Sequence, residues 1–436
     1  MTLLRLRLWW TRAFWVIPIL GLFVAILLAF FAGELDDWHD TAFEGVPLIS
    51  GPAAITVLSA VGGGMVTFTG FVFSLILLLL QFGSSQYSPR TVAFFLRARS
   101  TQVILALFLA NALFCFLAVL GTGSLGRAEF SPVISVIFAM CLLFISLVAF
   151  VILMHLVAKR IRIDSVVTAL GQQSRQVLIE SGRRLPKTVP VASAASGELL
   201  DHGVRYSNGG GQVVAIDYQA LARMTEKLGL PIALSVRVGD GISPGVRIAM
   251  TTGEGAHDGA IGRCIVVYGE RSLHHDPLYG LRILVDIALK ALSPAVNDPT
   301  TAVRSLNEID GVLRIANSLR WQPITRGSGA TLTIPVPTWE EVVDLAIREI
   351  RLMGVYQPQV TRRVSALLLD LLPDLTADRQ VCVRHHLEQL RSQVAETMSA
   401  AEAEFALTGD RQGIGGTLVL AESVDLGPGA LPADLG

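Results

Sequence analysis

Four apolar runs in the first 158 residues constrain this chain more than any other feature. Each reaches the length of about twenty residues that a helix needs to cross a bilayer. The composition agrees, because 52% of the residues are hydrophobic and 16% are charged, where soluble proteins average about 25% charged. The sequence therefore predicts a membrane α-helical bundle over 1–158, embedded in a lipid bilayer. Its four transmembrane helices are expected at about 13–33, 54–82, 102–121 and 132–157.

Basic residues beside these runs predict a single orientation. They precede the first run, separate the second from the third, and follow the fourth, whereas the other two loops hold almost none. By the positive-inside rule, the N-terminus and everything after residue 158 face the cytoplasm. We therefore expect a multi-pass protein of the bacterial inner membrane with both termini cytoplasmic. The basic residues are Arg5, Arg7, Arg12, Arg90, Arg97, Arg99, Lys159, Arg160 and Arg162.

The second run is unusual because no charged residue occurs from Gly45 to Pro89 and its first half is rich in glycines and hydroxyls. Small residues let membrane helices approach closely. One interpretation is a packing helix at the centre of the bundle, and the other is a helix that lines a pathway in a homo-oligomer. No acidic, basic or histidine residue occurs in the four runs before His155, which argues against a proton relay. The candidate pore-lining residues are Gly63, Thr67, Gly70, Ser74 and Gln81.

After residue 158 the composition is that of a soluble α+β domain. We expect a helical extension and linker over 159–202, then a small β-rich subdomain over 203–270. The turn GDGISPG joins two β-rich runs, as in the hairpins of small barrels, so a barrel-like subdomain is one form this block could take. The run 259–270 is ambiguous: Ile265, Val266 and Val267 favour a strand, and a short helix is the alternative.

A helical domain is expected over 271–408, and a disordered tail over 409–436, where glycine, proline and acidic residues dominate. Two of its helices begin with the same dipeptide, Asp276–Pro277 and Asp298–Pro299. Aspartate at the N-cap accepts free N–H groups of the first turn, and proline at the next position has no N–H to satisfy. Arg282 and Asp286 lie four apart and are expected to pair. Further helices are predicted from Trp339, over 358–371 and over 377–406, after a strand in 331–337.

These segments resemble a known family. ALSPAVNDPTTA in the block 271–302, FSLILLLLQFGSSQYSPR (Phe73–Arg90) and GQVVAIDYQAL (Gly211–Leu221) are similar to the bacterial membrane proteins grouped as DUF2254. The likeness extends from the first apolar segment to about residue 405. It implies an architecture and no reaction, and within 259–270 it favours a short helix over the strand.

No stretch carries a catalytic signature, since GxxxxGK[ST], GxSxG and HExxH are all missing from the sequence. A net charge of −1 implies no general attraction to nucleic acid. The cluster of His257, His274 and His275 with neighbouring aspartates has poor spacing for a metal, so neither a metal nor a cofactor is expected. We therefore expect a protein that is not an enzyme.

One polar group near the helix starts has two interpretations. The residues could form a pocket where two helix N-termini favour an anion, or they could simply cap the helices. They are Arg271, Asp276, Asn297, Asp298 and Arg304. For the whole chain, the prediction is an oligomeric ion or small-solute channel with a cytoplasmic regulatory domain. The alternative is a membrane-anchored sensing or scaffolding protein without a pathway.

Overall fold

The computed structural model describes residues 15–42, 49–86, 99–124, 132–161, 163–184, 200–252, 255–269, 271, 273, 276–319, 324–326 and 331–411. The chain divides into two compact units, Met1–Arg162 and Ile163–Gly436. Two predicted segments fall mainly outside the described residues: the second half of the linker expected over 159–202 and most of the tail expected over 409–436.

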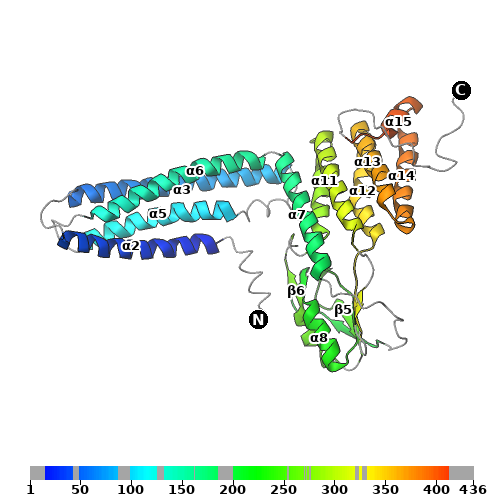
Figure 1. The fold of residues 1–436 in the computed structure, drawn as a ribbon, viewed down its shortest axis with the longest axis horizontal. Helices are drawn as coiled ribbons and strands as arrows, with labels where there is room; N and C mark the ends of the chain where they lie inside the picture. The colour runs from blue at the N-terminus through cyan, green and yellow to red at the C-terminus, as the bar shows by residue number, and fades with distance from the viewer. Residues whose placement is uncertain are drawn as a thin grey trace. The chain divides into compact units, whose positions relative to one another are not determined.

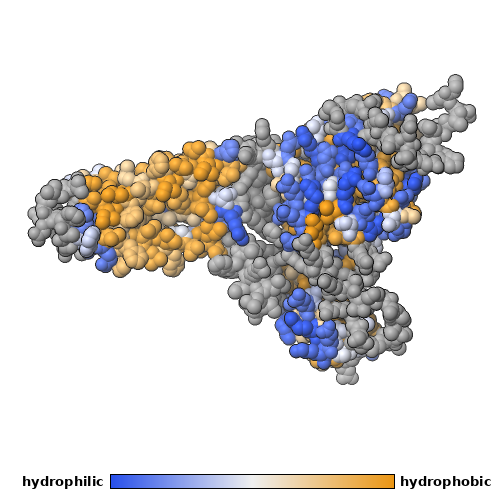
Figure 2. Space-filling view, in the orientation of Figure 1, coloured by the Kyte–Doolittle hydropathy of each residue, from blue (hydrophilic) through white to orange (hydrophobic). Residues whose placement is uncertain are grey.

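The first unit contains four helices that are long and apolar enough to cross a membrane, as the sequence predicts. They run side by side in Figure 1, and their outer surface is almost continuously hydrophobic in Figure 2. Each extends past its apolar run, because a helix continues into the polar interface as long as its backbone bonds are made. The helices are α2 (Val16–Ala42), α3 (Gly51–Gln86), α5 (Arg99–Ser124) and α6 (Val133–Ile161).

The centre of this bundle is α5 and not α3. Half of the apolar window of α5 is buried inside the unit, compared with 22% for α3. Phe108 and Phe114 of α5 are completely buried. Phe108 stacks edge-on with Phe68 of α3 at 5.4 Å between ring centroids. Within one chain the central place therefore belongs to α5, although α3 does pack against α5 and α6 as one interpretation expects.

A buried carboxylate joins α2 to the start of α6. Asp36 is 1% exposed, and its Oδ1 accepts a hydrogen bond from the Ile134 N–H at 2.7 Å. Its Oδ2 accepts from the Ser135 hydroxyl at 2.5 Å. These bonds satisfy amides that a helix N-terminus leaves free, so one helix caps another inside the apolar bundle.

The second unit opens with α7 (Ile163–Arg184), which packs on a helical hairpin made of α10 (Tyr279–Ala291) and α11 (Pro299–Asn317). The remaining helices follow later in the chain. α13 is buried along almost its whole length, and it lies among the other helices in Figure 1. These later helices are α12 (Trp339–Gly354), α13 (Pro358–Leu371), α14 (Ala377–Thr397) and α15 (Ala400–Leu407), with the 3-10 turn η1 (Leu372–Asp374) after α13.

Local signals set several helix boundaries. Thr338 and Glu341 form the capping box that starts α12. The helix expected over 377–406 is divided at Met398–Ser399, because Ser399 and Glu402 form a second capping box. Gly409 and Asp410 are buried, and Arg411 contacts α13 through Asp370 at 2.5 Å. These three residues therefore belong to the fold, contrary to the prediction of a disordered tail from residue 409.

The described strands form two open sheets and no closed barrel. The five-stranded sheet has the order β1-β5-β3-β8-β7, and the three-stranded sheet has the order β4-β2-β6. β3 pairs antiparallel with β5, and its other edge pairs in parallel with β8. The predicted hairpin is present only in part, because β3 ends before the first of its two runs and Gly241–Ile242 of its turn form β4 in the other sheet. The strands are β1 (His202–Arg205), β2 (Gly211–Ile216), β3 (Ile232–Leu234), β4 (Gly241–Ile242), β5 (Arg247–Thr251), β6 (Ile265–Tyr268), β7 (Ile324–Arg326) and β8 (Leu332–Ile334).

The barrel-like form is wrong. β8 follows the helical hairpin in the chain, and it pairs with the edge of β3 that a closed barrel would need. A hydrophobic core that includes Val213, Ile248 and Leu332 lies among these strands and α8 (Tyr218–Leu228). The ambiguous run 259–270 contains both predicted elements, since α9 (Asp258–Cys264) leads directly into β6.

Candidate functional site

The candidate pore-lining residues share one face of α3. They are separated by four, three, four and seven residues, the spacing of a single stripe on an α-helix. All are exposed within the chain. Around Gly63 and Gly70, no atom lies within 4 Å of the position that an added Cβ would take. Gly63, Thr67, Gly70, Ser74 and Gln81 thus form an uncharged, small-residue stripe on the outer surface of an apolar helix, called here the α3 stripe.

The hydroxyls of the α3 stripe use their hydrogens within the helix. Thr67 Oγ1 donates to the Gly63 carbonyl at 3.1 Å, and Ser74 Oγ donates to the Gly70 carbonyl at 3.0 Å. These bonds satisfy the donor of each hydroxyl and leave its oxygen lone pairs directed outward. The stripe is therefore a weakly polar surface that presents acceptors.

Packing inside the chain uses a different face of α3. An alanine Cβ at Gly62 would lie 3.0 Å from the Cys115 Cβ of α5. Met65, Val72 and Ile76 of α3 are buried and belong to the core that α3 shares with α5 and α6. The close approach that glycine allows is therefore used within the chain at Gly62. Among the described residues, Gly63 and Gly70 make no such close contact with another helix.

At the start of α10, the buried Asp276 pairs with the half-buried Arg271. Asp276 is 2% exposed, and its Oδ1 accepts the N–H groups of Leu278 and Tyr279, each at 3.1 Å. Its Oδ2 accepts from Arg271 Nε at 2.7 Å. Burial raises the pKa of Asp276, and the Arg271 guanidinium opposes that shift. The helix begins at Tyr279, later than Pro277, but Asp276 still satisfies its first free amides.

Asp298 is the N-cap of α11, and its carboxylate accepts from the Thr301 N–H at 3.1 Å and the Thr301 hydroxyl at 2.5 Å. Asn297 has a φ of 47°, and its Oδ1 accepts from Gln357 Nε2 at 2.9 Å. Arg304 pairs with Asp164 of α7 at 3.3 Å. The five candidate residues therefore have different partners. Arg271 and Asp276 contact each other, and Asp298 contacts its own helix. Asn297 contacts the N-cap residue of α13, and Arg304 contacts α7.

Two glycines of the hairpin bring it into close contact with α7. An added Cβ at Gly280 of α10 would lie 1.9 Å from the Ser174 Oγ of α7, and one at Gly311 of α11 would lie 2.6 Å from Arg175 Nη1. Arg175 also pairs with Glu308 of α11 at 2.8 Å.

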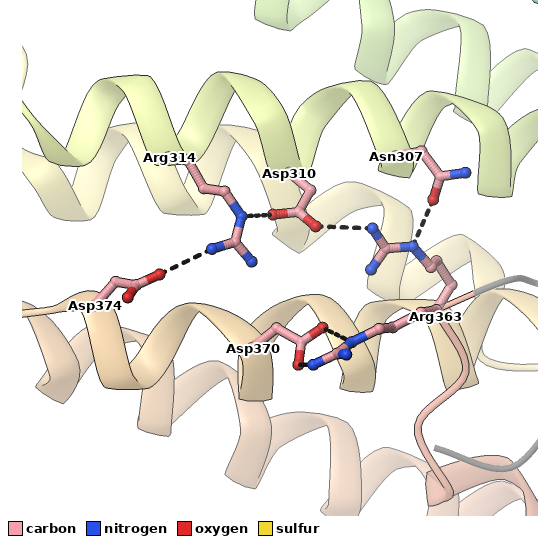
Figure 3. Close-up of polar contacts among 7 residues, drawn as sticks. Asn307, Asp310, Arg314, Arg363, Asp370 and Asp374 are labelled. Atoms are coloured by element: carbon pink, nitrogen blue, oxygen red, sulfur yellow. Dashed lines mark hydrogen bonds and ion pairs between the residues drawn. The ribbon is translucent and has the colours of Figure 1, made fainter. Parts of the chain in front are cut away.

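A network of arginines and carboxylates, which the sequence reasoning missed, joins α13 to its neighbours (Figure 3). Arg363 of α13 is 4% exposed and donates to Asn307 Oδ1 at 2.6 Å and Asp310 Oδ2 at 2.9 Å. Arg314 donates to the other oxygen of Asp310 at 2.8 Å and to Asp374 at 2.8 Å. The carboxylates balance the cations here, so the network serves to position helices.

The preceding residue, Arg362, contacts the segment 405–410 near the end of the described chain. Its Nε donates to the Thr408 carbonyl at 3.1 Å, its guanidinium lies 3.9 Å from Asp410, and it covers the Phe405 ring at 4.4 Å from the centroid. In the sequence, Arg362 and Arg363 are two adjacent arginines in a helix of mainly apolar residues. An exposed helix face would produce the same pattern.

The histidines do not form a metal site in the described part of the chain. Asp258 is paired with His202 Nε2 at 3.0 Å, and no group of three or more metal-binding side chains occurs among the described residues. His274 and His275 lie outside those residues. His386 of α14 is buried. The neighbouring His385 forms a hydrogen bond between its Nε2 and Gln389 Nε2 at 2.8 Å.

Four apolar helices followed by a mixed α+β unit define this chain as an integral membrane protein. The family model described as "Predicted membrane protein (DUF2254)" matches residues 11–370, and the chain belongs to this family. The uncharacterized proteins Mb1321c of Mycobacterium bovis and Rv1290c of Mycobacterium tuberculosis are each 30% identical to it over 446 residues. Each alignment covers 96% of this chain and 82% of the relative. No solved structure matches the chain significantly.

Proposed function

We propose that this protein is a homo-oligomer of the bacterial inner membrane, in which the α3 stripes of several subunits surround a pathway for an ion or small solute. The observation that carries this proposal is the exposure of the stripe. Gly63, Thr67, Gly70, Ser74 and Gln81 are all exposed on a helix whose internal packing uses another face. The proposal assigns no catalytic reaction to the chain.

The physical argument concerns what small residues gain in a bilayer. A glycine or threonine offers lipid little contact area, but it allows close helix–helix contact or leaves room for water. None of the residues that the structure describes fills the open space at Gly63 and Gly70. A second subunit or an aqueous path is therefore the environment that suits this face. The outward lone pairs of Thr67 and Ser74 suit a cation or a neutral solute better than an anion.

The same contacts supply the argument for the alternative, a membrane-anchored sensing or scaffolding protein without a pathway. Both hydroxyls already donate to backbone carbonyls of their own helix, so the stripe could pack against another subunit without water. In that case the function would reside in the second unit, and α3 would only hold subunits together.

The orientation is also a proposal. The arginine and lysine clusters support a cytoplasmic N-terminus and a cytoplasmic second unit. In this arrangement α7, which continues the chain after α6, places the hairpin on the cytoplasmic side. There the second unit could act on the pathway through α7.

The experiment pairs oligomer mass in detergent with ion flux into liposomes for Thr67→Leu, Gly70→Leu and the parent protein. A leucine on a pathway narrows and dewets it, so we expect intact oligomers with reduced flux. Gly33→Leu is the matched control, because Gly33 is exposed on α2 with no atom within 4 Å of an added Cβ. It should change neither quantity.

Two outcomes would decide against the pathway. If the parent passes no ion or solute while both leucine variants fall apart into monomers, the dry interface of the alternative is favoured. If the parent is monomeric, both forms of the proposal fail.

A further inference from the structure

Three arginines are buried in the described part of the second unit: Arg351, Arg362 and Arg363. Arg362 lies 3.9 Å from Asp410, and Arg363 lies 2.9 Å from Asp310. Arg351 differs from both, because no carboxylate among the described residues lies within ion-pair distance of its guanidinium. A buried cation without a counter-charge is costly, so Arg351 calls for a specific explanation.

The present partners of Arg351 are neutral. From α12 its guanidinium reaches α14, where Nη2 donates to Gln389 Oε1 at 2.7 Å and Nη1 donates to Gln393 Oε1. Its Nε is buried and has no hydrogen-bond partner. Amide oxygens satisfy donors but leave the positive charge in place. Burial accordingly lowers the pKa of Arg351 from its ordinary value.

Nearby charges do not supply the missing anion. Asp344 opposes the fall in the pKa of Arg351, but its carboxylate pairs with Arg348 at 2.5 Å and lies 3.6 Å from His386 Nε2. His386 is buried, and burial together with Arg351 lowers its pKa to about 4, so it is neutral at physiological pH. Its Nδ1 is buried without a partner. Asp344 is thus matched by Arg348 at the exposed edge of α12, and Arg351 has no paired carboxylate among the described residues.

We propose that Arg351, with Gln389 and Gln393, forms a binding site for a small oxyanion of the phosphate class. A guanidinium presents a planar fork of donors that matches two oxygens of an oxyanion. Gln389 and Gln393 are half-buried, and each amide can rotate about its last side-chain bond. Each amide would then offer its NH2 donors to the anion in place of the carbonyl oxygen that now faces Arg351.

This site is independent of the proposed pathway, because it lies wholly between α12 and α14 of the second unit. Its position gives the soluble part of the chain a means to sense an anion. The network around Arg363 lacks that potential, since its arginines and carboxylates are already matched.

The test measures thermal unfolding of the full chain in detergent while inorganic phosphate replaces chloride at constant ionic strength. We expect a saturable rise in the unfolding midpoint that Arg351→Gln abolishes. Arg348→Gln is the matched control: Arg348 is 58% exposed and paired with Asp344, so the rise should persist. Arg351→Lys keeps the charge but loses the fork, and it should weaken the apparent affinity at least tenfold.

Equilibrium dialysis with radioactive phosphate provides a second measurement that needs no unfolding. If Arg351→Gln does not fold, the comparison of Arg351→Lys with the parent decides the question by dialysis. Binding of equal affinity in the parent and Arg351→Lys, or no saturable phosphate binding by the parent, would overturn the proposal.

Discussion

The Thr67 hydroxyl donates to the Gly63 carbonyl at 3.1 Å, and both residues lie on the exposed face of α3. This bond satisfies the donor of the hydroxyl and leaves its oxygen available as an outward-facing acceptor. A helix surface of this kind is polar enough to face water and smooth enough to face another helix. The proposed function follows from this double capacity.

Replacement of Asp298 by alanine should lower the free energy of unfolding of the second unit by about 1 kcal/mol, within a range of about 0.5–2. The change removes the acceptor for the Thr301 N–H and hydroxyl. Chemical unfolding of the full chain in detergent measures it. Asp298→Asn keeps an acceptor at the N-cap and should stay close to the parent. Unchanged stability with loss of flux in Asp298→Ala would instead indicate a polar functional pocket.

Gly280→Ala should destabilise the contact between α7 and the hairpin. The new Cβ would lie 1.9 Å from Ser174 Oγ and 2.8 Å from Ser174 Cβ, so the helices must separate. Overpacking of this kind costs about 1–3 kcal/mol. Gly262→Ala is the control, because it also lies in a helix but meets nothing within 4 Å. Equal unfolding midpoints for the two variants would show that the close helix contact does not exist.

Stability should decrease in acid because of His386. Its pKa is lowered to about 4 by burial and by Arg351, with Arg348 and His385 acting in the same direction and Asp344 against them. As pH falls from about 6.5 to about 4, the unfolded chain takes up a proton at this residue and the folded chain does not. Folding therefore loses stability across that window, by on the order of 3 kcal/mol for a shift of this size.

The measurement for His386 is the unfolding free energy between pH 4 and pH 7, compared with His386→Leu. Other groups titrate in both proteins, so only the difference is informative. The difference should change most between pH 4 and pH 6.5 and be flat above pH 7. A constant difference throughout would mean that His386 is protonated equally easily in the folded and unfolded chains.

The orientation predicts which loops a membrane-impermeant thiol reagent reaches in intact cells. Asp40→Cys, between the first and second runs, should be labelled from outside. Phe95→Cys, between the second and third runs, should be labelled only after the cells are opened. The reverse pattern would place the second unit outside the cytoplasm.

Features fixed by neighbouring residues could be predicted from the sequence. Apolar length identified the four membrane helices, Thr338 and Glu341 marked the start of α12, and the spacing of Arg282 and Asp286 predicted an ion pair that forms at 2.8 Å. The second capping box, Ser399 with Glu402, was equally visible, and it explains why the last predicted helix is divided.

Features that depend on distant residues could not be predicted in this way. β3 and β8, which pair in parallel, precede and follow the helical hairpin in the chain. No local pattern encodes their pairing. Arg351, Arg362 and Arg363 resemble ordinary surface charges along the sequence. Only the packing of α11, α14 and α15 around α12 and α13 shows that they are buried.

The central claim, that the α3 stripe faces an aqueous path, is tested most directly by thiol accessibility along α3. The four native cysteines are replaced, and single cysteines are introduced at Gly63, Thr67, Gly70, Ser74 and Gln81. Val66 and Phe73, exposed apolar residues of the same helix, serve as lipid-facing controls. A small water-soluble thiol reagent, applied to the protein in liposomes, should modify the stripe positions at least tenfold faster than the controls. Equal, slow rates at all seven positions would contradict the claim.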